Sequence, residues 1–198
     1  MTEHTSPKRR GRPRGVSDAR ARIIAAAIEE FGEHGYEAAT IRLIAARAGV
    51  DSALVHHYFG TKADLFAEAI GIPLRPDIDV PGILAGPRDE IGERLIRYVL
   101  QAFEQPDIRR RGVMLLRTAI GSKLTTPLLA GFLSRELLSR VAKSLDVDDA
   151  ELRASLVASQ IAGMLIARYV LRLPALAAAP VDDLVARVGP TVQRYLFD

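Results

Sequence analysis

The sequence predicts an all-α protein with a three-helix unit near its N-terminus and a larger helical domain after it. Apolar residues recur at helical spacing along most of the 198 residues. No alternating strand pattern of useful length appears. Glycine and proline cluster between residues 71 and 87, which indicates a long irregular connection. We therefore expect a flexible basic arm over residues 1–17, a compact helical unit over 18–66 and a second helical domain over 67–198.

The N-terminal arm carries the excess positive charge of the chain. Residues 1–20 hold six basic and two acidic side chains, a net charge of +4, whereas the whole chain sums to +3. A flexible basic arm gains affinity for nucleic acid from phosphate attraction and counterion release. The run Arg10-Gly11-Arg12-Pro13, followed by Arg14, resembles an AT-hook and predicts arginines in an A·T-rich minor groove. A disordered basic tail without sequence preference is the alternative.

A first helix is expected from about Asp18 to His34. Ser17 is suited to cap its N-terminus, and Gly35 is suited to end it. Its acidic residues Glu29, Glu30 and Glu33 are predicted to form a solvated face without function.

The stretch 40–48 predicts a short second helix. Its apolar residues follow the i, i+3, i+4, i+7 pattern of a single buried face; they are Ile41, Ile44, Ala45 and Ala48. Thr40 is suited to be the N-cap, and the free N–H groups that follow it can seat a phosphate. Gly49 ends this helix, and Asp51 is suited to cap the next one at once. So tight a turn between two short helices indicates a helix-turn-helix.

The helix that follows has the features of a DNA-recognition helix. Val55 and Phe59, with the apolar part of Tyr58, suit its inner face. Its outer face is small and polar at its beginning, which lets the backbone approach base edges in the major groove. That face comprises Ser52, Ala53, Leu54, His56 and His57. Thr61 then begins the next helix with Asp64 in its first turn, and Lys62 is placed to reach a phosphate.

The region from about Arg22 to Phe66 resembles the DNA-binding domain of the TetR (tetracycline-repressor) family. The matching positions are Ala26, Phe31, Gly35, Tyr36, Thr40, Ile44, Ala45, Ala48, Gly49, Val50, His57, Tyr58, Phe59, Lys62 and Leu65. Two positions depart from the pattern, since His56 replaces the usual tyrosine and Asp51 the commoner serine. The resemblance implies phosphate contacts by Thr40, Tyr58 and Lys62, and we expect Arg42 to reach a guanine edge.

Composition limits the class of protein further. The chain has no cysteine, which excludes disulfides and favours an intracellular protein. The basic N-terminus is not followed by the apolar stretch of a signal peptide, so we expect a cytoplasmic location.

Five helices are expected in the second domain, after the connection over residues 71–87. Their ranges are 88–103, 107–122, 126–144, 149–173 and 181–197. Pro127 suits the first turn of a helix, and Pro174 and Pro180 bracket a short turn before the last one.

The segment 154–171 is apolar nearly all the way round, so it must be covered on two sides. We expect it to pack against an identical helix across a twofold axis, with residues 181–195 completing a four-helix bundle. The resemblance supports such a homodimer, which would match a palindromic operator. An ordinary core helix is the alternative. Ser159, Gln160 and Arg168 argue against a transmembrane helix.

A small-molecule cavity is expected in the second domain because the resemblance implies a ligand-controlled switch. Aromatic, flexible and polar side chains of these helices could line it, and each could equally be plain core or surface. The candidates are Tyr98, Phe103, Met114, Arg117, Thr118, Phe132, Met164, Arg168 and Tyr169. An inward Arg117 or Arg168 would favour an anionic effector.

No motif in the chain predicts an enzyme. The four histidines lack the spacing of a shared metal site, and no nucleophile elbow, phosphate loop or dinucleotide fingerprint is present. We expect neither a catalytic residue nor a metal or other cofactor. The sequence therefore predicts a dimeric transcriptional regulator that binds a double-stranded DNA operator and a small-molecule effector, and the resemblance favours a repressor. A non-enzymatic architectural DNA-binding protein without an effector is the alternative.

Overall fold

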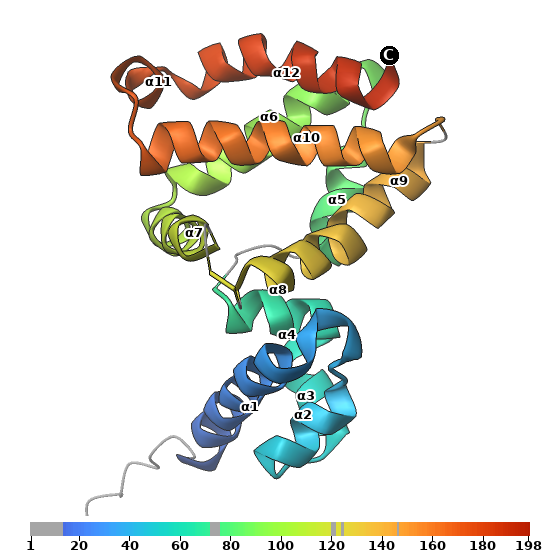
Figure 1. The fold of residues 1–198 in the computed structure, drawn as a ribbon, viewed down its shortest axis with the longest axis vertical. Coiled ribbons are helices and arrows are strands. Elements are labelled where there is room, and N and C mark those ends of the chain that lie inside the picture. The colour runs from blue at the N-terminus through green and yellow to red at the C-terminus, as the bar shows by residue number, and fades with distance from the viewer. Residues whose placement is uncertain (1–13, 72–75, 120–121, 124, 146) are drawn as a thin grey trace, which may run out of the picture.

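The computed structural model describes residues 14–71, 76–119, 122–123, 125–145 and 147–198, without the side chains of residues 14–17 and 76–77. Every regular element among them is a helix, which confirms the all-α prediction. The molecule is elongated, with the N-terminal helices at one end and the C-terminal helices at the other (Figure 1). The N-terminal residues of the arm, including Arg10 and Arg12, lie outside the described residues.

Four helices form the N-terminal end of the molecule. They are α1 (Arg14–Ala38), α2 (Ile41–Ala48), α3 (Ser52–Phe59) and α4 (Lys62–Ala69). Helix α1 begins one turn before the expected start, so Ser17 lies inside it and is not its cap. The first N–H groups of a helix have no partner within it, and water can satisfy them where a helix end is open to solvent, so the extra turn can form without Ser17 as its cap. Gly35 interrupts α1 as expected, with φ 79° and ψ 169°.

The proline-rich connection contains a helix that the sequence analysis did not predict. Helix α5 runs from Pro76 to Leu84 and includes Pro81. Pro76 occupies the first turn, where a missing N–H costs nothing. Pro81 removes one backbone hydrogen bond, and burial of the neighbouring Val80 helps to hold the segment in place. Proline content alone was therefore a poor guide to this segment.

The remaining helices build the second domain. They are α6 (Ile91–Glu104), α7 (Pro106–Ala119), α8 (Thr125–Phe132), α9 (Ser139–Leu145), α10 (Ala150–Leu165), α11 (Pro174–Ala178) and α12 (Val181–Phe197). Two π-helical stretches, Leu133–Leu138 and Ile166–Val170, continue α8 and α10. The helix expected over 126–144 thus forms as α8 and α9 joined by a π-helical stretch. The turn expected after Pro174 contains the short helix α11.

Helices α6 and α12 make the closest packing in the second domain. A Cβ atom added at Gly92 would lie 2.4 Å from the carbonyl oxygen of Gly189. The Gly92 N–H donates to Gln193 Oε1 at 2.8 Å. Ile96 and Val185 belong to the buried apolar cluster beside this contact. The two glycines therefore let the helix backbones meet, and neighbouring apolar groups fill the core on either side.

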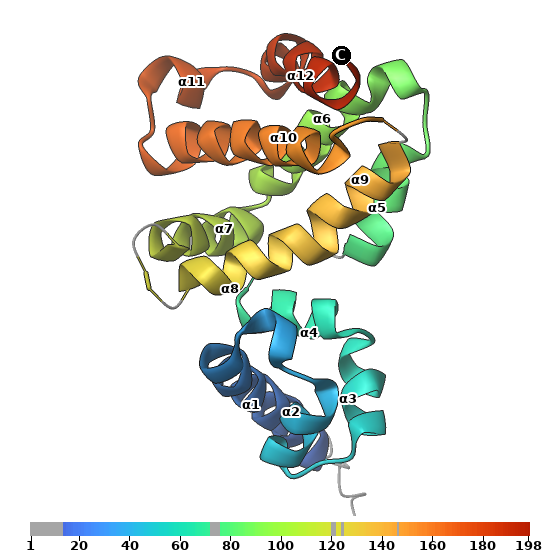
Figure 2. The same ribbon diagram turned by 45° about the vertical axis from the view of Figure 1, so that its right-hand side comes forward.

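Helix α10 lies below α11 and α12 in the view of Figure 2, and one stripe of its surface is exposed. Leu152 is 61% and Leu156 39% exposed, and Ser159 and Gly163 continue the same exposed stripe. By length and composition alone Ala150–Val170 could cross a membrane, and 22% of its most apolar window is buried. Its opposite face packs against α9 and α12.

Replacing Gly92 by alanine should destabilise the protein, because the added methyl group meets backbone atoms that cannot move aside. We expect a loss of about 2 kcal/mol, typical of overpacking, in the free energy of unfolding measured by urea titration at a fixed protein concentration. Gly82→Ala is the control, since a Cβ there has no neighbour within 4 Å. Equal unfolding midpoints for the two variants would contradict the close packing of α6 and α12.

Candidate functional site

The turn between α2 and α3 has the geometry that the sequence predicted. Thr40 is extended at φ −127°, and its Oγ1 accepts a hydrogen bond from the Leu43 N–H at 3.2 Å. Gly49 closes α2 at φ 65°, a left-handed conformation that glycine adopts without strain. Asp51 Oδ1 then accepts from the Ala53 N–H at 2.7 Å and starts α3. Local caps therefore end one helix and start the next within a turn of a few residues, and the shared core packs the two helices together.

The outer face of α3 is presented as expected. Val55 and Phe59 are buried in the core of the N-terminal domain. Ala53, His56 and His57 are exposed, and Ser52, Leu54 and Tyr58 are partly exposed. Arg42 of α2 is also exposed. The face that could enter a groove is thus small at its N-terminal end and carries two histidines further along.

His56 has a structural contact that the sequence analysis did not foresee. Its Nδ1 lies 2.8 Å from the carbonyl oxygen of Gly60. Because a carbonyl oxygen only accepts, Nδ1 must carry the proton, and Nε2 of the neutral ring is left as an acceptor. His56 therefore stabilises the C-terminal end of α3 through a ring nitrogen, an atom that tyrosine lacks.

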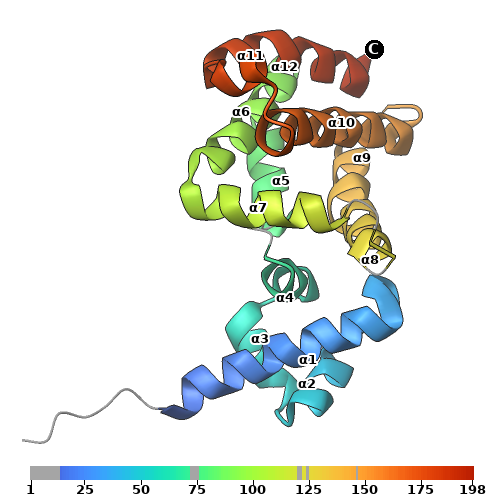
Figure 3. The ribbon, with the colours of Figure 1, turned by 60° about the vertical axis from the view of Figure 1, so that its left-hand side comes forward.

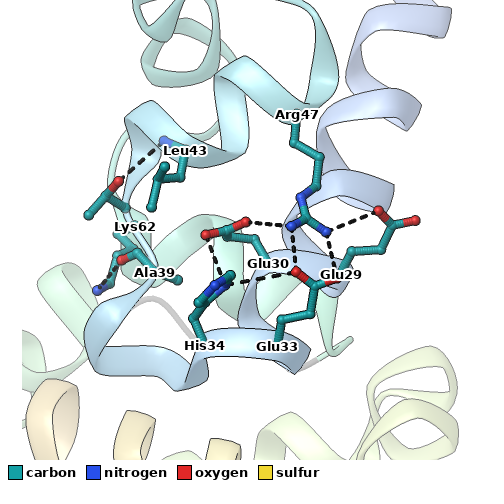
Figure 4. Close-up of polar contacts among 9 residues, drawn as sticks. Glu29, Glu30, Glu33, His34, Ala39, Leu43, Arg47 and Lys62 are labelled. Carbon is teal, nitrogen blue, oxygen red and sulfur yellow. Dashed lines mark hydrogen bonds and ion pairs between the residues drawn. The ribbon is translucent and has the colours of Figure 1, made fainter.

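Lys62 is held more firmly than a simple phosphate contact requires. Its ammonium donates to the carbonyl oxygen of Ala39 at 2.9 Å (Figure 4). It also donates to the carbonyl oxygen of Glu37 at 3.3 Å and lies 4.6 Å from the centre of the Tyr36 ring. Burial lowers the pKa of Lys62. The lysine thus satisfies the carbonyl groups at the end of α1 with two of its three protons.

The acidic face predicted on α1 is solvated only in part, because Glu29 and Glu33 are exposed whereas Glu30 is buried. All three surround Arg47 of α2, whose guanidinium lies 2.5 Å from Glu33, 3.1 Å from Glu30 and 3.4 Å from Glu29 (Figure 4). The side chain of Glu30 is only 3% exposed. A hydrogen bond from Arg47 lowers the pKa of Glu33. The helical spacing placed these residues on one face of α1, but only the tertiary fold shows that Glu30 is buried beside Arg47 of α2.

The same face brings Glu30, Glu33 and His34 within 4.8 Å of one another, close enough for a shared cation. His34 Nδ1 already lies 3.2 Å from Glu30, and Arg47 supplies a positive charge to both carboxylates. The arrangement is therefore explained as an ion-pair network between α1 and α2.

Phe132 is not a cavity residue, contrary to the sequence prediction. It is fully buried in the core of the N-terminal domain, where it contacts Tyr36 and Phe66 at ring-centre distances of 5.5 and 4.8 Å. The Tyr36 hydroxyl donates to Glu136 Oε1 at 2.7 Å, and Arg135 pairs with Glu37 at 2.5 Å. Burial, with this hydrogen bond, raises the pKa of Tyr36. Helix α8 and its π-helical continuation are thus joined to α1, as Figure 3 shows from the side.

The second domain has a cleft of about 750 Å³ beside α7, the π-helical end of α10 and α11. Five of the nine predicted residues line it, namely Met114, Arg117, Thr118, Arg168 and Tyr169. Phe103 stacks behind Tyr169, with ring centres 5.1 Å apart. Tyr98 is hydrogen-bonded to Asp79 and does not line the cleft, and burial raises its pKa. Met164 is buried in the core.

Several residues of the cleft escaped the sequence analysis. They include Glu104, Arg109, Arg110 and Arg172. A signal was present on α7, where Arg109, Val113 and Arg117 follow one another at four-residue spacing and so share a face. The run of three arginines at 109–111 was visible in the sequence as a sign of a basic surface on α7. Which residues near α10 and α11 complete the cleft depends on the tertiary fold.

Replacing Arg47 by methionine should weaken the N-terminal domain, because the Glu30 carboxylate would stay buried without its cation. We expect a loss of about 2 kcal/mol in the free energy of unfolding, measured by urea titration. The double variant Glu30→Met/Arg47→Met removes both charges and should recover most of that loss. A double variant as unstable as Arg47→Met would show that the buried pair is not the cause.

Comparisons with known proteins agree with this geometry. The model "Bacterial regulatory proteins, tetR family" matches residues 23–69, and "Tetracyclin repressor-like, C-terminal domain" matches residues 89–196. The regulator BetI of Agrobacterium fabrum is 33% identical over 176 residues, which cover 84% of each chain. The dual regulator CecR of Shigella flexneri is 35% identical over 136 residues, which are 63% of this chain and 53% of CecR. The chain thus spans about half the length of that relative.

A solved structure supports the whole fold as well. A TetR-family regulator from Streptomyces coelicolor A3 is 32% identical and superimposes with a TM-score of 0.50, covering 96% of this chain and 100% of that one. The C-terminal family model alone matches more than half of the sequence. The chain therefore belongs to the TetR family of bacterial regulatory proteins.

Proposed function

We propose that this protein is a sequence-specific DNA-binding transcriptional regulator, a homodimeric repressor released from a palindromic operator by a small-molecule effector. The observation that carries this proposal is the outer face of α3, which is small at its N-terminal end and fixed by the Asp51 cap. Such a face lets a recognition helix approach base edges closely. We assign the protein no catalytic role, and a regulator of bacterial DNA would act in the cytoplasm.

In this proposal residues 52–58 of each subunit occupy successive major grooves. Thr40, Tyr58 and Lys62 contact phosphates, and Arg42 reaches a guanine edge. The two bonds from Lys62 to the end of α1 leave one ammonium proton for a phosphate. His56 and His57 offer ring nitrogens on the same exposed face. The basic arm with Arg10, Arg12 and Arg14 would follow the neighbouring minor groove.

The effector signal would reach α3 through the junction of the two domains. Helix α7 lines the cleft, and α8 follows it in the chain and carries Phe132 into the core of the N-terminal domain. A shift of α8 would move Tyr36 through its bond to Glu136, and Lys62 lies over the Tyr36 ring. Changing the tilt of α1 and α4 in both subunits would alter the spacing of the two recognition helices.

The uncovered stripe of α10 supports the homodimer. Leu152 and Leu156 are large apolar side chains exposed on one helix face, next to the small Gly163. A second copy of α10, together with α12, would remove this surface from water and complete a four-helix bundle. The resulting twofold axis matches an operator of two half-sites.

Binding to DNA from beside the protein's own gene tests the proposal. Footprinting should find a palindromic site that is bound about 10³-fold more tightly than random DNA. Lys62→Ala should weaken binding to both DNAs and lower the salt slope by about 1, whereas Arg42→Ala should relax the preference at one base pair. Lys143→Ala, an exposed lysine of α9, is the control. Similar affinity for operator and random DNA would favour the architectural alternative.

Replacing Leu156 by glutamate should separate the dimer, because a charge would enter the apolar seam between the two copies of α10. Sedimentation velocity should show a monomer, and operator affinity should fall since one subunit reads only a half-site. Ile78→Glu changes an equally apolar residue that is 53% exposed on α5, and it should leave a dimer. A dimeric Leu156→Glu variant would refute this interface.

A further inference from the structure

The cleft beside α7 concentrates positive charge. Five arginines line it, namely Arg109, Arg110, Arg117, Arg168 and Arg172, against the single carboxylate of Glu104. Their formal sum of +4 exceeds the net charge of +3 for the whole chain. The rest of the protein therefore carries a net charge of about −1. A concave surface with charge of one sign focuses its electric field and attracts counter-ions.

Arg168 forms the buried part of this surface. Its side chain is 7% exposed, and Nη1 donates to the carbonyl oxygens of Leu176 at 2.5 Å and Ala179 at 2.9 Å. Nη2 lies 3.6 Å from Glu104, and Nε is buried without a hydrogen-bond partner among the described residues. Arg168 therefore fixes α11 against the end of α10, and one of its own donors is buried without a partner among the described residues.

Three further arginines of the cleft have no ion-pair partner among the described residues. Arg109, Arg117 and Arg172 form no side-chain hydrogen bond or ion pair within the part of the chain that the structure describes. Arg110, in contrast, pairs with Asp107 at 3.0 Å. Arg172 sits at φ 56°, where the chain turns from the π-helical stretch toward α11. Guanidinium groups on α7 and on this turn thus line one cleft from two elements.

The other side chains that line the cleft indicate what the uncharged part of a ligand would be. Val113, Met114 and Tyr169 provide apolar and aromatic surface. The volume of about 750 Å³ is far larger than an inorganic anion needs and is typical of a site for an organic molecule. Planar guanidinium groups bind phosphate and carboxylate oxygens in pairs, with more geometric selectivity than a lysine.

We propose that this cleft binds an organic polyanion, a molecule with at least two phosphate or carboxylate charges on an apolar or aromatic body. This inference rests on the proposed function, since such a molecule would be the effector of the regulator. Arg117 and Arg172 would bind its charged groups, and Tyr169 would contact its body. Binding would tie α7 to the end of α10 and so reach the helix that leads into α8.

Calorimetric titration of the full-length protein at low salt tests the inference with simple probes. ADP supplies phosphates on an aromatic body, benzene-1,3,5-tricarboxylate supplies carboxylates, and adenosine is the uncharged counterpart of ADP. At least one of the two anions should bind at least about tenfold more tightly than adenosine, and its affinity should fall as salt rises. Whichever of the two anions binds more tightly shows whether the cleft prefers phosphate or carboxylate groups. Failure of both anions to exceed adenosine would overturn the proposal.

The variants Arg117→Gln and Arg172→Gln locate the binding site. Both residues are exposed, so neither replacement should change the unfolding midpoint. Each should weaken anion binding by about tenfold, and the double variant by more. Arg111→Gln is the matched control, because Arg111 lies on α7 but does not line the cleft. Anion binding that survives the double variant, or falls equally in Arg111→Gln, would refute this site.

Operator binding, measured separately on the same protein, keeps the two proposals apart. Sequence-specific DNA binding without anion binding would refute the cleft assignment and leave the regulator intact. Anion binding that depends on Arg117 and Arg172, in a protein without sequence preference, would support the cleft and refute the regulator.

Discussion

The two domains share one aromatic cluster, and the arrangement of the molecule depends on it. Phe132 comes from the second domain but is buried among Phe31, Tyr36 and Phe66 of the first. Aromatic rings bury large apolar areas and pack with defined geometry, so α8 cannot shift without disturbing α1 and α4. The hydrogen bond from Tyr36 to Glu136 adds a polar contact at the edge of the same cluster. The recognition helix is consequently connected to the second domain through packed side chains.

Features that arise from neighbouring residues could be predicted from the sequence. The caps at Thr40, Asp51 and Thr61 and the turn at Gly49 depend on side chains within three residues of the backbone groups that they satisfy. Such contacts leave a recognisable local pattern, and for that reason the turn between α2 and α3 and the exposed face of α3 were predicted correctly. The last helix, expected over 181–197, was predictable in the same way, because its pattern is local.

Features that arise from distant residues were predicted poorly. The burial of Glu30 depends on Arg47 of another helix, and the position of Phe132 depends on how α8 crosses α1. Only five of the nine expected cavity residues line the cleft, because helical periodicity does not determine which face turns toward α11. The proline-rich segment formed α5 since a proline in the first turn is compatible with a helix. The sequence therefore predicted the helices well and their partners less well.

The bond between Tyr36 and Glu136 also has an optical consequence. The chain has five tyrosines and no tryptophan, so its near-ultraviolet absorbance and emission come mainly from tyrosine. Burial and the neighbouring carboxylate raise the pKa of Tyr36, so this phenol should ionise only at strongly alkaline pH while the junction is intact. One of the five tyrosine chromophores thus lies at the contact between the domains, and loss of that contact would add one phenol to those that ionise at ordinary alkaline pH.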